Sequence, residues 1–145
     1  MFVLTILLII NLCNVATATD SPFSVSLKLF KPIVISEVKN LAFPDTMLGF
    51  SKDLVVSSTD DNSAQFDLVG SSGANIVTAI MENSINLSAP GVSTAVLVDN
   101  FTVKAPVALN SSGKGTIGVG GTAHISSDNQ DGNYIGLATL RVVYQ

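Results

Sequence analysis

The C-terminal stretch of the chain reads Gly132-Asn-Tyr-Ile-Gly-Leu-Ala-Thr-Leu-Arg-Val-Val-Tyr-Gln145. In its second half an apolar side chain recurs at every second position, at Ala138, Leu140, Val142 and Tyr144. Successive side chains of a β-strand point to opposite faces, so a period of two is typical of a strand with one buried face. The stretch therefore predicts a strand over residues 134–144.

The same kind of pattern recurs along the chain before this stretch. We expect further strands over residues 23–29, 33–43, 54–56, 64–68, 75–81, 95–104 and 115–125. Turn-forming clusters such as 57–63 and Gly70-Ser-Ser-Gly73 separate them, and helical spacing is not sustained after position 18. About eight strands with regular turn signals predict an all-β fold, specifically an immunoglobulin-like antiparallel β-sandwich.

The N-terminus has the features of a secretory signal. Residues 2–10 form an apolar run of nine, too short for the roughly 20 residues of a transmembrane helix. Ala16-Thr17-Ala18 follows as a small-x-small cleavage site, so we expect a signal over residues 1–18 and export of the rest. The run is preceded by no Lys or Arg, so either the true start lies upstream or the signal is atypical.

Cys13 is the single cysteine, and its fate depends on this signal. We expect it to leave with the signal, so that the mature chain begins at Thr19 and holds no thiol. The alternatives are a lipoprotein modified at Cys13, for which Leu12 is a poor preceding residue, and a buried N-terminal element. A single cysteine also excludes a disulfide framework.

The composition argues against an enzyme and against a nucleic-acid partner. The 145 residues include seven Lys or Arg, with a net charge of −4, whereas nucleic-acid binding needs a clustered basic face. The single histidine, His124, has no partners nearby in the sequence for a metal site of three or four ligands. No Gly-x-Ser-x-Gly elbow is present, so an extracellular hydrolase lacks its residues. We expect no catalytic residue, cofactor or metal, and a surface position for His124.

Gly118-Val-Gly-Gly121 is the most glycine-rich segment of the chain. It lacks the lysine and the helix start of a phosphate-binding loop. Glycine inside a strand pattern more often marks a bulge or a close backbone approach. We expect one of these two structures here.

The C-terminal stretch resembles the last strand of chaperone–usher pilus subunits. Those proteins have a penultimate aromatic residue, alternating apolar residues before it, and a glycine about fourteen residues from the end. Tyr144 and Gly132 match the two outer positions, and Ala138, Leu140 and Val142 match the alternation. The resemblance implies a surface that a periplasmic chaperone binds by strand addition. The absence of a disulfide departs from the classical pattern.

A second resemblance covers most of the mature chain. Val119-Gly-Gly-Thr122, a short loop, Gly132-x-Tyr-x-Gly136 and a strand ending in Tyr144 are similar to secreted bacterial proteins grouped as domain of unknown function 4402. Proteins of that group are thought of as surface-appendage or adhesin-like, and no chemistry is established for them. The resemblance implies a pilin-like fold without catalytic residues.

The resemblance to pilus subunits also implies a role for the segment after the signal. Phe23, Val25, Leu27 and Leu29 alternate with polar residues, as in the N-terminal extension that a pilus subunit donates to its neighbour. Residues 19–31 are therefore either such an extension or the first strand of a complete sandwich, and residues 32–145 form the β-sandwich domain.

We expect a non-enzymatic subunit of a bacterial surface appendage, exported through the periplasm to the cell surface. It would polymerise by β-strand exchange, with a periplasmic chaperone as partner, no nucleic acid, and no membrane span in the mature chain. The alternative is a monomeric secreted adhesin, or a β-sandwich module that binds carbohydrate or protein.

Overall fold

The computed structural model describes residues 18–145. All of the expected signal except Ala18, including Cys13, lies outside these residues. The described part of the chain holds eight strands and no helix. They are β1 (Val34–Lys39), β2 (Lys52–Val56), β3 (Ala64–Val69), β4 (Ile76–Ile80), β5 (Ile85–Leu87), β6 (Val96–Lys104), β7 (Lys114–Ile125) and β8 (Leu140–Tyr144). The all-β prediction is confirmed.

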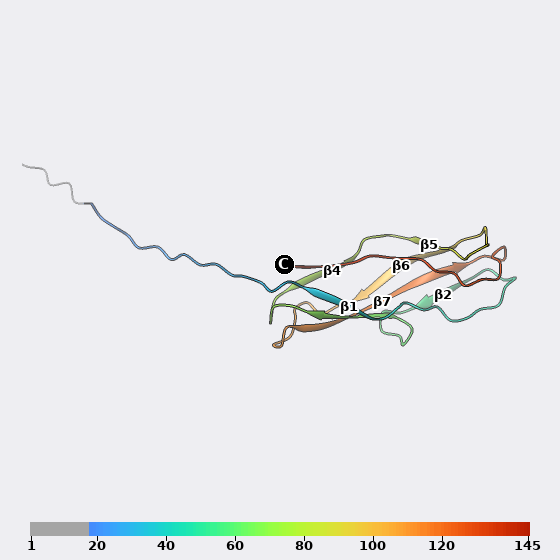
Figure 1. Ribbon diagram of the computed structural model, residues 1–145, viewed down its shortest axis with the longest axis horizontal. Coiled ribbons are helices and arrows are strands. Elements are labelled where there is room, and N and C mark those ends of the chain that lie inside the picture. The colour runs from blue at the N-terminus through green and yellow to red at the C-terminus, as the bar shows by residue number, and fades with distance from the viewer. Residues whose placement is uncertain (1–17) are drawn as a thin grey trace, which may run out of the picture.

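The strands form two antiparallel sheets (Figure 1). The larger sheet is a curled half-barrel of six strands: five follow the order β1-β3-β7-β6-β5, and the sixth, β2, pairs with β7. The second sheet contains only β4 and β8. Figure 1 shows that the described chain before residue 30 runs away from these sheets at the end where the chain finishes.

The twelve-residue strand β7 organises the larger sheet because it has three neighbours. One edge pairs with β6, while the other pairs with β3 along its first half and with β2 along its second half. The chain between β2 and β3 must therefore cross close to the middle of β7. A Cβ atom on Gly118 or Gly120 would collide with backbone atoms of residues 56–58 there. The close backbone approach expected at these glycines is confirmed.

The buried core consists of two apolar clusters. The first is centred on β3 and β7 and contains Ala64, Leu68, Ile76, Leu109, Ile117 and Val119. The second lies between β6 and β7 and contains Val96, Val98 and Ala123. Side chains of β8 pack on the first cluster and stay partly exposed. The β4–β8 sheet therefore covers this cluster, but its own inward-facing side chains on β8 remain partly open to solvent.

The strand positions largely follow the sequence pattern. Seven expected strands have a counterpart, and β5 is additional. The last strand is shorter than expected because it begins at Leu140, and residues 132–139 before it make only one isolated bridge, from Ile135 to Ser88. Residues 23–29 belong to no strand of their own chain.

Candidate assembly surface

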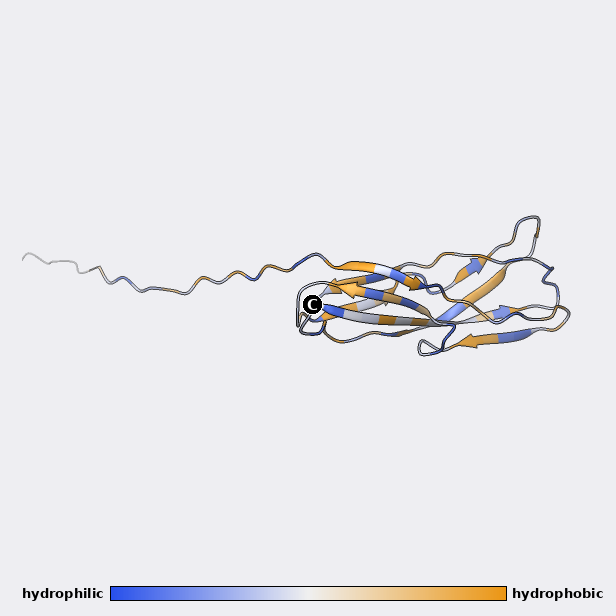
Figure 2. Ribbon diagram, turned by 60° about the horizontal axis from the view of Figure 1, so that its bottom comes forward, coloured by the Kyte–Doolittle hydropathy of each residue, from blue (hydrophilic) through white to orange (hydrophobic). Residues whose placement is uncertain are grey.

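Residues 19–30, called the arm below, project from the body of the protein (Figures 1 and 2). Figure 2 shows that apolar and polar positions alternate along the arm. The side chains of Phe23, Val25, Leu27 and Leu29 are 81–85% exposed. Water surrounds four large apolar groups in a regular row, which is unfavourable unless another surface covers them.

The arm is extended for reasons that its own sequence provides. Pro22 cannot donate a backbone hydrogen bond, and Phe23 and Val25, an aromatic and a β-branched residue, are of types that favour strand over helix. Near its end the Lys28 ammonium lies 4.8 Å from the centre of the Phe30 ring. The arm is thus a strand-forming segment without a pairing partner in the described chain.

The arm is fixed to the body at a joint formed by Phe30, Lys31, Ser71 and Tyr144. The rings of Phe30 and Tyr144 stack with centroids 4.7 Å apart. The Tyr144 hydroxyl donates to the Lys31 carbonyl and accepts from the Ser71 amide, both at 2.7 Å. The Lys31 amide donates to Ser71 Oγ at 2.6 Å. Glycine is favoured at residue 70 because a Cβ atom there would collide with the Tyr144 hydroxyl.

Strand β8 carries three of the five expected assembly residues of the C-terminal stretch. Leu140, Val142 and Tyr144 pair with β4 and turn their side chains toward the first core cluster. Each stays partly exposed. Among the described strands β8 pairs only with β4, so its second edge has backbone donors and acceptors without strand partners.

The remaining two expected residues lie before β8. Gly132 sits where a Cβ atom would come within 2.9 Å of the Ala89 side chain, so it permits close packing of its loop on the segment after β5. Ala138 is exposed. The next residue, Thr139, binds the Glu82 carboxylate through its amide at 2.7 Å and its hydroxyl at 2.8 Å. These two hydrogen bonds lower the pKa of Glu82.

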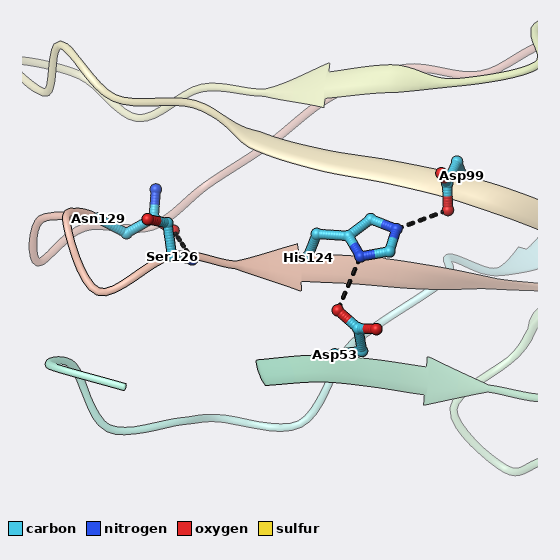
Figure 3. A network of polar contacts seen from close by, with 5 residues as sticks. All are labelled: Asp53, Asp99, His124, Ser126 and Asn129. Atoms are coloured by element: carbon cyan, nitrogen blue, oxygen red, sulfur yellow. Dashed lines mark hydrogen bonds and ion pairs between the residues drawn. The ribbon is translucent and has the colours of Figure 1, made fainter. Parts of the chain in front are cut away.

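His124 lies on the outer face of the larger sheet, between two carboxylates (Figure 3). Its Nδ1 is 2.7 Å from Asp53 Oδ1 on β2, and its Nε2 is 2.7 Å from Asp99 Oδ1 on β6. The side chains of His124, Asp53 and Asp99 are 33%, 61% and 30% exposed. The three residues, called the His124 bridge below, link three adjacent strands.

Both ring nitrogens of His124 face carboxylate oxygens, so both can donate only when the ring carries two protons. The hydrogen bond to Asp99, and then the one to Asp53, raise the pKa of His124 above its ordinary value of 6.5. The surface position of His124 was predictable, whereas its partners were not. Asp53 and Asp99 are 71 and 25 residues away in sequence. Only the strand pairing brings the three side chains together.

The described part of the chain has neither a metal-binding cluster nor a membrane-spanning helix. No group of three or more His, Cys, Asp or Glu side chains within residues 18–145 is arranged to hold a metal ion. Over the same residues there is no helix with the length and apolar character needed to cross a membrane.

Comparison with known proteins identifies the family. A family model described as "Domain of unknown function (DUF4402)" matches residues 45–144. No curated protein and no solved structure matches the chain. The match covers more than half of the chain and includes every strand after β1. The chain belongs to the DUF4402 family.

Proposed function

We propose that this protein is a non-enzymatic structural subunit that joins copies of itself by β-strand addition. The arm of one copy would pair with the free edge of β8 in a second copy. The β4–β8 sheet would gain a third strand, and an immunoglobulin-like, pilin-like sandwich would be completed in trans. The observation that carries the proposal is the row of four apolar side chains on the arm, each more than 80% exposed.

The acceptor edge is argued from the body of the protein. A sheet of two strands is only marginally stable, and three or more strands with an apolar face are normally needed. The partly exposed side chains of Leu140 and Val142 border the first core cluster, as does Ile33 just before β1. β1 and β8 are free sheet edges, and Lys31 and Tyr144 bring them close at one end. An added strand beside β8 would cover apolar surface that the body leaves open.

The apolar side chains of the arm would contribute a free energy of the same order as the cost of association. Burying one large apolar side chain contributes about 1.5–3 kcal/mol, so the four side chains of the arm contribute about 6–12 kcal/mol in total. Association itself costs an amount of the same order, about 4–15 kcal/mol. Backbone hydrogen bonds along β8 would supply the surplus and fix the register.

The proposal extends to location and partners. The N-terminal sequence is that expected of an exported protein, and membership of the DUF4402 family is compatible with a bacterial surface appendage. An apolar arm that no partner yet covers would promote aggregation. A periplasmic chaperone that covers the arm or the β8 edge during export would prevent this.

The decisive experiment compares a charge on the two faces of the arm. Leu27→Glu would place an ion in an apolar contact, whereas Ser26→Glu, one residue away, would place it on the opposite face of the same strand. We expect wild type and Ser26→Glu to form SDS-resistant, heat-labile oligomers, and Leu27→Glu to stay monomeric in light scattering. Equal assembly of Leu27→Glu and wild type would overturn the proposal, as would a wild type that never assembles.

A second candidate, a monomeric binding module, is supported by one hollow. It has a volume of about 570 Å³ on the larger sheet, and its floor includes Gly115, Thr116 and Gly118. Its only charged lining residues are Lys104 and Lys114, although the protein is acidic overall. This favours an anionic ligand such as an acidic polysaccharide. The test is whether the protein binds an acidic polysaccharide while it remains monomeric. Loss of this binding in the double variant Lys104→Ala, Lys114→Ala would support this candidate.

A further inference from the structure

The joint between arm and body holds the arm at one point only. Up to Leu29 the apolar side chains of the arm are highly exposed, whereas Phe30 and Lys31 contact Tyr144 and Ser71. Pro32 follows at once and fixes its own backbone φ angle. The direction in which the arm leaves the body is therefore determined within three residues.

Tyr144 is the residue on which these contacts converge. Its hydroxyl joins two segments that are 113 and 73 residues away in sequence, Lys31 and Ser71. Its ring supports Phe30, and Gly70 leaves the space that the hydroxyl occupies. Because Tyr144 also belongs to β8, the segment that projects and the proposed acceptor edge are connected through one side chain.

We infer that Tyr144 is a positioning residue that sets the direction of the arm relative to the body. Without its hydroxyl, Lys31 would lose a hydrogen bond from the body, and only the ring stack and the Lys31–Ser71 hydrogen bond would remain. The inference concerns the single copy. Its consequence for assembly, a fixed orientation between successive copies, rests on the proposed function.

The test measures the distance between arm and body in the monomer. Spin labels are attached at Ser24→Cys in the arm and Asp128→Cys in a body loop, in the full chain carrying Cys13→Ser. Pulsed electron paramagnetic resonance then gives the distribution of label distances in monomers that size-exclusion chromatography has separated from any oligomers. We expect one narrow distribution for wild-type Tyr144 and loss of that narrow peak in Tyr144→Phe, which keeps the ring but removes the hydroxyl.

The chain supplies a matched control in its other tyrosine. The Tyr134 hydroxyl bonds to the Gln130 carbonyl and amide and lies 3.2 Å from the Thr94 hydroxyl, all within the body. Tyr134→Phe should retain the narrow distribution even if it lowers the melting temperature. The inference is overturned if wild type is already broad, if Tyr144→Phe stays narrow, or if both variants broaden equally. Because every measurement is made on monomers, this result is independent of whether the protein polymerises.

Discussion

Two segments of this chain share one sequence pattern and have opposite environments. Residues 23–29 and 138–144 both place an apolar side chain at every second position. In the second segment Leu140, Val142 and Tyr144 pair with β4 and contact the core. In the first, every apolar side chain of the pattern is more than 80% exposed. Alternation thus indicates that a strand needs an apolar surface, but it does not indicate which chain provides that surface.

The largest expected effect is a loss of stability when a residue of the second segment is replaced, with no loss for a replacement in the first. Tyr144→Ala removes a packed ring and its two hydrogen bonds, so we expect the free energy of unfolding of the monomer to fall by about 3 kcal/mol. Phe23→Ala should leave it unchanged because Phe23 is 85% exposed. Urea unfolding of both variants, on monomers separated from any oligomers, measures the difference. An equal loss in Phe23→Ala would show that the arm packs on its own body.

A smaller effect is expected at the glycine beneath the joint. Gly70→Ala would press a methyl group against the Tyr144 hydroxyl and against Leu109, whose Cδ1 would be 2.8 Å away. We expect a loss of about 1–2 kcal/mol of stability, as for other overpacked sites. Ser72→Ala, in the same loop and exposed, is the control and should be neutral. If Gly70→Ala were also neutral, the joint would be looser than the contacts of Tyr144 indicate.

The smallest expected effect is a pH dependence confined to the body. Because the pKa of His124 is raised in the folded protein, its contribution to stability is fully present below pH 6.5 and is lost as the pH rises through the raised pKa. NMR titration should give a midpoint above 6.5, which Asp99→Asn should lower more than the more exposed Asp53→Asn does. A midpoint at or below 6.5 would contradict the bridge. His124→Gln should abolish this pH dependence.

The local pattern of apolar and polar residues was sufficient to predict the positions of most strands. Strands such as β3, β6 and β7 combine alternating or β-branched residues with clear turns at their ends, so their positions could be predicted. β5 was missed because three residues are too few to show a period. The curl of the larger sheet could not be predicted either, because it depends on which strands pair and not on any one of them.

Part of the candidate site could likewise be predicted from the sequence, and part could not. The alternating residues of the arm and of β8 were visible in the sequence, as was the role of the Gly118–Gly121 segment. The stack of Phe30 on Tyr144 and the His124 bridge were not, since each joins residues distant in sequence. Such contacts arise only from tertiary structure, and single-residue properties do not reveal them.

The projecting arm also has a consequence for symmetry. A segment that leaves one part of a copy and docks on a different part of the next copy forms a head-to-tail contact without a two-fold axis. Repeated contacts of this kind close into a ring only if the rotation between neighbours divides a full circle, and otherwise they grow as an open helix. In the proposed polymer, every copy added would leave one unused arm and one unused edge at opposite ends of the assembly. Such a polymer would be polar, and its two ends would grow by different reactions.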